Sequence, residues 1–234
     1  MRSIVIFFTL VFSATGVWAD TAQERLSDSA AVFSEIMSTP DKGIPQDLLR
    51  KAQCAVIVPG LKKGAFIVGG QYGRGFAICR RPKGLGWGPP AAIRIEGGSV
   101  GFQIGGSSSD LVMLVMNQGG MDRLMSDKFT IGADAAAAAG PVGRTAAAET
   151  DVELHAEILT WSRARGAFAG VSLDGATMRP DEGVNKELYG KNVSNRELLA
   201  SDMTPPAAAQ PLIKELDKYS PREVRSGGAS RENR

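Results

Sequence analysis

Short β-rich runs divided by glycine fill residues 53–117, and this texture constrains the fold more than any other feature of the chain. The runs include CAVIVPG, GAFIVGGQYG, GFAICRR and DLVMLVMN. Residues 55–58 and 111–116 are apolar at every position, which is typical of strands that are covered on both faces. We therefore expect a β-rich α+β domain built on a sandwich or a barrel-like sheet.

Helical patterns flank this region. The amino-terminal residues predict an amphipathic helix, because apolar side chains recur mostly at spacings of three and four: Leu26, Ala30, Phe33, Ile36 and Met37. A shorter helical turn is expected at residues 44–49. Further short helices are predicted at residues 121–125, 185–189 and 194–199, so the fold has amino-terminal helices and short carboxy-terminal ones.

The stretch GADAAAAAGPVGR, residues 132–144, raises the question of a phosphate-binding loop. It lacks the Gly-Lys-Ser/Thr ending with which a P-loop holds phosphate and magnesium, and it contains no Gly-x-Gly-x-x-Gly element. Alanines permit close approach of strands, and Gly140 and Gly143 suit a corner where side chains do not fit. We expect a small-residue corner of the sheet.

The two ends of the chain differ in composition from its middle. Residues 1–19 combine Arg2, an apolar stretch and small residues, which predicts a signal peptide cleaved after Ala19; an uncleaved anchor is the alternative. Residues 20–202 form the predicted domain. Residues 203–234 are rich in proline and polar residues, so a disordered tail is expected, apart from a helical turn at residues 212–216. The protein is expected to be periplasmic or secreted.

Charge and cysteine content limit the function further. The formal net charge is +2, which argues against bulk binding of nucleic acid, since that requires a strong basic field. Cys54 and Cys79 are the two cysteines, and an oxidising compartment makes a disulfide between them possible. Two buried free thiols on neighbouring strands are the alternative, and the sequence leaves both open.

Catalytic motifs are weak in this chain. His155 is the one histidine, and it lies between two glutamates on what reads as a solvated strand face, so we interpret it as a surface residue. Residues 97–101 match Gly-x-Ser-x-Gly around Ser99, but strand-like sequence follows where a nucleophile elbow needs a helix. The loop around Asp110 matches no calcium-binding spacing. We expect no enzyme, no metal and no cofactor.

Cations at expected turns suggest a different role. They lie in PGLKKG, YGRG and the segment before Trp87: Lys62, Lys63, Arg74, Arg80, Arg81 and Lys83. If several of these turns lie at one end of the sheet, the cations and Trp87 could meet an anionic head-group layer. Ordinary solubilising charge at loops and edges is the alternative.

Four separated strings resemble the SYLF domain family: AVIVPGLKKGAFIVGGQYGRGFAICR, GWGPPAAIRIEGGSVGFQIGGSSSDLVMLVMN, GADAAAAAGPVGR and RGAFAGVSLDGA. This family occurs in bacterial exported proteins and in eukaryotic actin-patch and membrane-trafficking proteins. The chain resembles the bacterial exported branch. The resemblance implies a non-catalytic lipid-binding module that uses an amphipathic amino-terminal helix and basic residues.

Carried over to this sequence, the resemblance places the amphipathic stretch at Leu26, Phe33, Ile36 and Met37 and the basic candidates at Lys62, Lys63, Arg80, Arg81 and Arg144. Lys83 and Trp87, from the segment described above, complete the predicted lipid-binding set. The expected partner is an anionic phospholipid surface, with actin not expected for an exported bacterial protein. Packing of the helix against the sheet is the competing interpretation. A protein-interaction or structural envelope module, and a hydrolase acting through acidic residues or a serine, are the alternative functions.

Overall fold

A computed structural model describes residues 20–220 apart from residues 40–42, 67, 83–85, 101–104, 143–155, 165–166, 172 and 174. The helical elements are α1 (Ala22–Ser38), α2 (Gln46–Lys51), α3 (Gln118–Leu124), α5 (Glu182–Tyr189), α6 (Asn195–Leu199), η2 (Ala207–Ala209) and α7 (Gln210–Tyr219). The strands are β1 (Cys54–Phe66), β2 (Val68–Cys79), β3 (Ala91–Val100), β4 (Gly105–Val115), β5 (Phe129–Thr130), β6 (Ala137–Ala139), β7 (Ile158–Ala164), β8 (Ala167–Gly170) and β9 (Thr177–Pro180).

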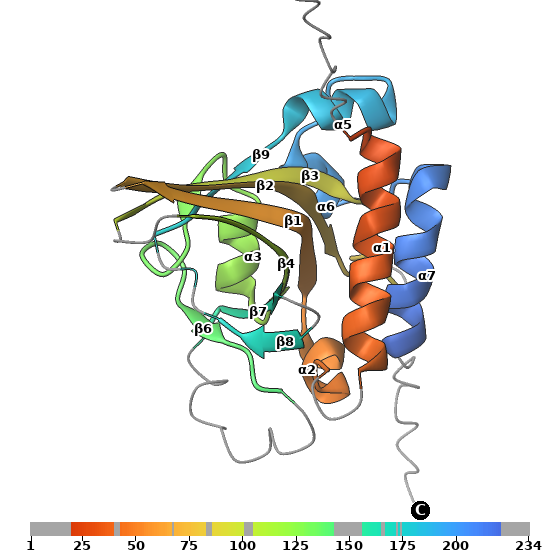
Figure 1. The fold of residues 1–234 in the computed structure, drawn as a ribbon. Coiled ribbons are helices and arrows are strands. Elements are labelled where there is room, and N and C mark those ends of the chain that lie inside the picture. The colour runs from red at the N-terminus through yellow and green to blue at the C-terminus, as the bar shows by residue number, and fades with distance from the viewer. Residues whose placement is uncertain are drawn as a thin grey trace, which may run out of the picture.

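The strands form one curled sheet in the order β5-β9-β3-β2-β1-β4-β7-β6, with β8 paired to β7. All its pairings are antiparallel except that of β6 with β7. Figure 1 shows the sheet bending like half of a barrel, with α1 and α7 on one side of it and α3 on the other. The expected α+β class with a barrel-like sheet is confirmed.

Hydrophobic cores lie on both faces of the sheet. One face packs against α1 and α7 through residues such as Ile57, Phe76 and Trp161. The other face packs against α3 and α6 through residues such as Val56 and Met113. Because successive strand residues point to opposite faces, residues 55–58 and 111–115 are buried at every position, as their apolar runs predicted.

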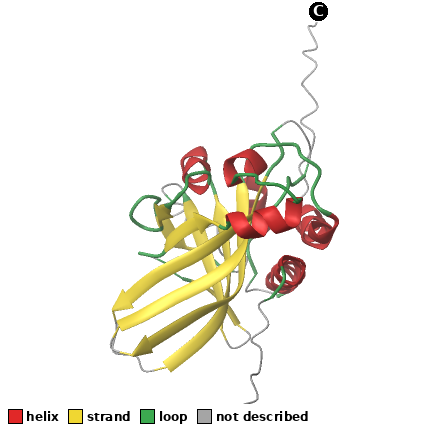
Figure 2. Ribbon diagram, turned by 90° about the horizontal axis from the view of Figure 1, so that it is seen from above, coloured by secondary structure: helices red, strands yellow, loops and turns green. Residues whose placement is uncertain are grey.

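Strands β1 to β4 are longer than the helices can cover. Figure 2 shows them projecting past the helices. We call residues 54–58, 75–79, 91–93 and 111–115 the covered half of these strands. We call residues 62–66, 68–74, 94–100 and 105–109 the bare half; many of its residues are exposed, for example Lys62, Lys63, Tyr72, Gly98 and Ser108.

The segments PGLKKG and YGRG lie inside strands rather than in turns. The first belongs to β1, where the pairing register with β2 and β4 shifts at Pro59 and Gly60. Gly60 has a φ of 59°, a conformation that suits glycine at a bulge. The second lies in β2, where a Cβ on Gly75 would approach Ile57 O to 2.0 Å. Glycine therefore serves a bulge and a close backbone contact here, where the sequence suggested turns.

The carboxy-terminal helix corrects the predicted domain boundary. Residues 207–219 form η2 and α7, and Leu212, Ile213 and Leu216 are buried. Helix α7 lies beside α1, and Phe33 contacts Tyr219 edge to face with ring centroids 6.3 Å apart. The prediction of a disordered tail from residue 203 is therefore wrong for residues 207–219. The predicted helical turn is part of a longer helix, whose apolar side packs against the core. Residues 221–234 lie outside the described part of the chain.

The alanine-rich stretch forms the predicted corner. Residues 137–139 pair with β7, and a Cβ on Gly140 would lie 2.1 Å from the Trp161 ring. The Trp161 indole N–H donates to Pro141 O at 3.0 Å. A side chain does not fit at Gly140 because the indole fills that space. Residues 143 and 144 lie outside the described part.

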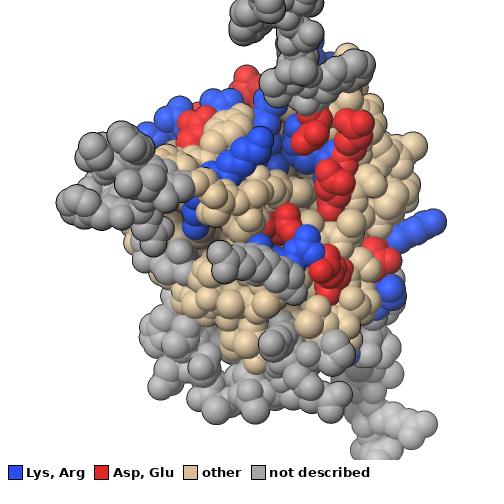
Figure 3. All heavy atoms as spheres, in the orientation of Figure 1, with Lys and Arg blue, Asp and Glu red and all other residues tan. Residues whose placement is uncertain are grey.

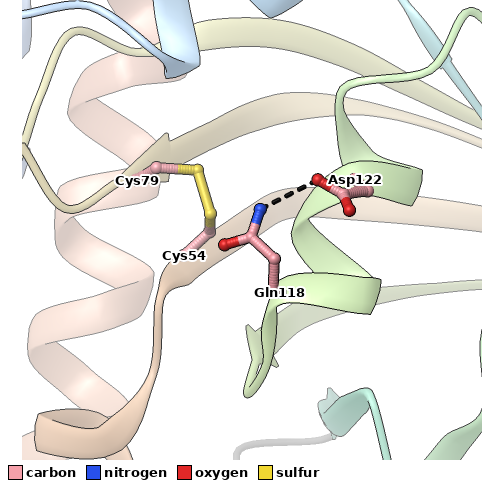
Figure 4. Close-up of a disulfide and its surroundings, with 4 residues drawn as sticks. All are labelled: Cys54, Cys79, Gln118 and Asp122. Atoms are coloured by element: carbon pink, nitrogen blue, oxygen red, sulfur yellow. Dashed lines mark hydrogen bonds between the residues drawn. A yellow bond between two sulfur atoms is a disulfide. The ribbon is translucent and has the colours of Figure 1, made fainter. Parts of the chain in front are cut away.

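Cys54 and Cys79 form a disulfide that joins β1 to β2 (Figure 4). The two residues are directly opposite in the register of these strands. Of the two possibilities that the sequence left open, the structure has the bridge. It lies at the covered end of the sheet, close to α3, where Gln118 donates to Asp122 at 2.8 Å.

Candidate functional site

The bare half of the sheet carries a regular array of polar side chains on the same side as α1. Side chains alternate along β2, so Tyr72 and Arg74 share the face of buried Phe76. Across the strands, Arg74 is opposite Arg94, which is opposite Arg179 on β9. We call the set of Lys62, Tyr72, Arg74, Arg94, Glu96, Thr177 and Arg179 the basic face.

The second row of the basic face lies next to the arginines. Tyr72 is opposite Lys62 on β1 and opposite Glu96 on β3, and Glu96 is opposite Thr177. Tyr72 is 47% exposed, and Lys62 is also exposed. The two rows place a half-exposed aromatic ring among four cations. Tyrosine at such a position has both an apolar body and a polar tip to offer a partner.

Three arginines in one row need a reason, because like charges directly opposite each other destabilise a sheet. Two carboxylates reduce the repulsion. Arg74 Nε lies 2.7 Å from Asp181 Oδ2, and Arg94 Nε lies 2.7 Å from Glu96 Oε1. Arg179 Nε is 3.8 Å from the other oxygen of Glu96, so two arginines share one carboxylate.

Positive charge therefore remains in surplus on this face. Two carboxylates pair with three arginines, and no ion pair joins Lys62 to any described residue. The arginine side chains keep 35–40% of their surface exposed, so their guanidinium groups are available to an anion. In Figure 3, Lys and Arg side chains gather over β2 and β3, beside acidic side chains along α1.

The predicted cations do not gather at one end of the sheet. Lys62 and Lys63 are both exposed, but they are consecutive strand residues and point to opposite faces. Arg80 follows Cys79, which pairs with Cys54, eight residues along β1 from Lys62 and hence about 25 Å away at a normal strand rise. Of the predicted cations that the structure describes, Lys62 and Arg74 belong to the basic face.

Trp87 and Arg80 are buried, which excludes them from an exposed membrane-binding loop. The Arg80 guanidinium lies 4.1 Å from the centre of the Trp87 ring and donates to Ser220 O and Leu49 O at 2.8 and 3.2 Å. Trp87 donates its indole N–H to Ser220 Oγ at 3.2 Å. These residues anchor the end of α7, a role that their sequence neighbourhood could not reveal.

Arg81 is half-buried beside this anchor. Its side chain donates to Trp87 O at 3.1 Å and to Asp202 O at 3.3 Å. Burial raises the pKa of the nearby Asp217 carboxyl, although Arg80, the Trp87 N–H and Arg81 act in the opposite direction. Arg81 therefore holds the backbone of residues 87 and 202, and its charge lies away from the basic face.

The predicted membrane-inserting residues of the amino-terminal helix are core residues. Leu26, Phe33 and Ile36 are each 0% exposed and belong to the cluster between the sheet, α1 and α7. The amphipathic pattern was correct, but the partner of its apolar face is protein. The exposed side of α1 carries Glu24, Asp28 and Glu35, which would repel an anionic surface.

Several predicted residues lie outside the described part of the chain. These are Lys83, Arg144, His155 and the signal-peptide residues 1–19. Their predicted roles stay predictions.

The candidate catalytic residues have structural surroundings. Ser99 lies in β3 opposite Gly69, in a strand rather than at a strand-to-helix elbow. Asp110 accepts the Gly60 N–H at 2.9 Å and the Arg163 Nε–H at 2.7 Å, and Arg163 also pairs with Glu35 of α1. Among the described residues, no group of three or more His, Cys, Asp or Glu could hold a metal ion.

Comparison with known proteins adds the family. Residues 96–219 match the family model described as "Ysc84: Las17-binding protein actin regulator". This chain belongs to the Ysc84 family, the family of SYLF domains. Its place in an exported bacterial branch stays a prediction.

Individual relatives agree with this assignment. The chain is 32% identical over 198 residues to human "SH3 domain-containing YSC84-like protein 1". The aligned region covers 83% of the chain and 57% of the human protein. It is 32% identical over 191 residues to the bovine protein of the same name, covering 80% and 55%. It is 31% identical over 180 residues to "LAS seventeen-binding protein 3" of Saccharomyces cerevisiae S288c, covering 76% and 39%. The chain thus spans about half the length of these relatives.

These findings correct the expectation about actin. Actin is not expected as a partner of an exported protein, but the matching family is described as an actin regulator and the yeast relative is named "LAS seventeen-binding protein 3". That expectation is wrong. The family description and the name of the yeast relative both state a binding function, which agrees with the predicted binding function at that level.

The structure also reveals site residues that the sequence did not single out. Arg94 and Arg179 complete the basic face, and they come from two strand segments that are far apart in the sequence, AAIRIEGG and TMRP. Alternation of Arg94 and Glu96 with buried Ile93 and Ile95 was a signal for an exposed strand face. Strand register, which the sequence does not show, brings Arg179 beside them.

Residues 20–220 contain no described helix that is both long enough and apolar enough to cross a membrane.

Proposed function

We propose that this protein is a non-catalytic binding module that docks on anionic phospholipid surfaces through the basic face. The observation that carries the proposal is the row Arg74–Arg94–Arg179 beside a second row that contains Lys62 and Tyr72, on one face of the sheet. A slightly positive face with an exposed aromatic ring suits a layer of phosphate groups. The sheet holds the cations in place before binding, so little conformational entropy is lost.

The proposed mechanism differs from insertion of the amino-terminal helix. Burying the apolar face of α1 in lipid would require its separation from the sheet and α7, and would expose the core that Phe33 and Leu26 now fill. Docking through the basic face leaves that core intact. The cations bind phosphate oxygens, and Tyr72 enters the interfacial layer. Export belongs to this proposal and is supported by the composition of residues 1–19 and by the Cys54–Cys79 disulfide. The absence of catalysis also belongs to it, and rests on the weak catalytic motifs of the sequence.

Vesicle co-sedimentation of the full chain tests the proposal. Arg94→Gln combined with Arg179→Gln removes two cations from the basic face. At about 1 kcal/mol for each basic residue near an anionic surface, binding to vesicles of phosphatidylglycerol and phosphatidylcholine should weaken about 30-fold. Binding of the unchanged protein should also fall as salt rises, since the Debye length shortens.

The matched control is Arg196→Gln combined with Lys214→Gln. These residues are exposed on α6 and α7, away from the basic face, and the control removes the same charge. Its binding should stay within about twofold of the unchanged protein, a difference of about 0.4 kcal/mol. Equal losses in both double variants, or equally strong binding to pure phosphatidylcholine at high salt, would show that the basic face is not a lipid-docking surface.

A second candidate ligand is an acidic protein surface, and the family description as an actin regulator favours actin filaments. The same cations would then pair with carboxylates instead of phosphates. Co-sedimentation with actin filaments in the absence of lipid separates the two candidates. Filament binding that the Arg94→Gln, Arg179→Gln variant loses, without any vesicle binding by the unchanged protein, would replace lipid with actin as the ligand.

A further inference from the structure

The outer edge of β4 offers a second interaction surface, which shares only Lys62 with the basic face. Strand β7 pairs with β4 only at residues 110–115, whereas β4 begins at residue 105. Residues 105–109 pair with β1 on one side. On the other side, no described strand pairs with them. A strand edge of this kind presents backbone N–H and C=O groups to any extended chain that approaches.

The hydrogen-bonding register identifies the groups that point outward. Met116 N–H donates to Glu157 O, so Met116 directs its backbone groups toward the β7 side of β4. Backbone groups alternate in direction along an antiparallel strand. The extra residues at the register shift between β1 and β4 are Pro59 and Gly60 of β1, so the alternation along β4 itself is not interrupted. Ser108 and Gly106 therefore direct N–H and C=O away from β1, to the open edge.

This edge lacks the usual protection against strand addition. Natural edges are guarded by charged side chains, prolines or bulges on the edge strand itself. Here the edge strand reads Gly-Gly-Ser-Ser-Ser over residues 105–109, and residues 106–108 are exposed. No side-chain hydrogen bond or ion pair joins Ser107, Ser108 or Ser109 to another described residue. An added strand would meet only small side chains.

Charge selects the kind of segment that would bind. Lys62 is opposite Ser108 and Lys63 is opposite Ser107, so the strand behind the edge places one cation on each face of the sheet. Neither lysine has an ion-pair partner among the described residues. An added strand would lie about 10 Å from β1, two strand spacings away, within reach of extended lysine and glutamate side chains. Adjacent acidic residues on that strand would meet both lysines.

The same charges argue against two other occupants. Pairing of β4 with β4 of a second copy would bring two Lys62–Lys63 pairs together with no carboxylate on residues 105–109. Residues 221–234 contain four arginines and two glutamates, so their net charge is also positive.

We infer that the β4 edge at residues 105–109 binds an extended acidic segment of a partner protein by β-strand addition, with Lys62 and Lys63 pairing with its carboxylates.

An NMR titration of the full chain tests this inference. The probe is the peptide Thr-Val-Glu-Glu-Val-Thr, whose two glutamates point to opposite faces of an added strand. Amide resonances of Gly106 and Ser108 should shift on binding, and a peptide with lysine in place of both glutamates should bind at least tenfold more weakly. Methylating one edge-facing peptide nitrogen should abolish the shifts, because it removes a backbone donor.

Two variants at one position separate backbone pairing from other effects. Ser108→Pro removes the outward N–H while leaving the ladder to β1 intact, since proline is tolerated where the N–H faces away from the partner strand. It should weaken peptide binding at least tenfold, whereas Ser108→Ala should stay within twofold. Ser108→Pro should leave vesicle binding unchanged, and the Arg94→Gln, Arg179→Gln variant should leave peptide binding unchanged.

Three results would overturn the inference. One is equal affinity for the acidic, basic and N-methylated peptides. Another is peptide-induced shifts that are confined to the basic face and absent at Gly106 and Ser108. The third is a concentration-dependent dimer, measured by sedimentation velocity, that Ser108→Pro abolishes; it would assign the edge to a second copy of this chain.

Discussion

The two halves of strands β1 to β4 use the same backbone for different purposes. In the covered half, residues such as Ile57 and Phe76 are 0% exposed, and both faces of the sheet are packed. In the bare half, Tyr72 is 47% exposed, Ile95 is still buried on the face opposite the arginines, and lysine, arginine, glycine and serine are common. The rigid core end holds the open end in place, so binding groups can be displayed without a loop. The bulge at Gly60 divides the two halves.

The largest expected contrast compares one aromatic residue from each region. Phe33→Ala removes a fully buried ring between α1, α7 and the sheet, so the free energy of unfolding should fall by about 3–5 kcal/mol. Tyr72→Ala, in the bare half, should change it by no more than about 0.5 kcal/mol. Urea unfolding followed by circular dichroism measures both. Comparable losses would mean that the bare half is part of the cooperative core.

The disulfide gives the second contrast. Replacing both Cys54 and Cys79 by alanine opens a loop with a sequence separation of 25, which should reduce the free energy of unfolding by about 3 kcal/mol on the chain-entropy model. Because the bridge lies at the covered end, vesicle binding at temperatures below unfolding should be retained. If a variant that is still folded lost vesicle binding, the disulfide in the covered half would be required for the binding surface in the bare half, contrary to our expectation.

Two glycines of one strand give the third contrast. A Cβ on Gly75 would lie 2.0 Å from Ile57 O, whereas a Cβ on Gly70 in the bare half would lie 3.8 Å from Gly97 O. Gly75→Ala should destabilise the fold by about 1–3 kcal/mol through overpacking. Gly70→Ala should be neutral within about 0.5 kcal/mol. Thermal unfolding of the pair distinguishes the two regions, and equal melting temperatures would contradict the difference in packing.

The smallest expected effect concerns the start of α1. The Thr21 backbone N–H and hydroxyl donate to the Glu24 carboxylate, which lowers the pKa of Glu24 below its ordinary value. This contribution to stability is present above the ordinary pKa and is lost as pH falls through the lower pKa of the folded state. An NMR titration of the carboxyl carbon should find the lowered pKa, and Thr21→Ala should raise it toward the ordinary value. An unchanged pKa in that variant would exclude the Thr21 hydroxyl as a cause, since the variant keeps the Thr21 backbone N–H.

Much of the covered half could be predicted from the sequence. The uninterrupted apolar runs indicated strands buried on both faces, and the spacing of Leu26, Phe33 and Ile36 indicated an amphipathic helix. Small residues before Pro141 indicated a corner where side chains do not fit. These features follow from local periodicity and side-chain size, which the sequence displays directly.

The bare half was less predictable, because its proposed function depends on strand register. A one-residue shift of β9 against β3 would move Arg179 to the opposite face and destroy the row with Arg94. Glycines suggested turns at YGRG, where the structure has a continuous strand, since glycine suits both a turn and a close backbone contact. Burial of Arg80 and Trp87 depends on Ser220, which is far away in the sequence and meets them only in the folded chain.

The most direct test of our central claim compares where the protein meets the membrane. An environment-sensitive fluorophore is attached at Tyr72→Cys on the basic face and, in a second sample, at Ala31→Cys on the exposed side of α1. Addition of anionic vesicles should shift the emission of the first label to shorter wavelength and leave that of the second unchanged. A blue shift at position 31 with none at position 72 would show that the helix, and not the bare sheet, is the docking surface.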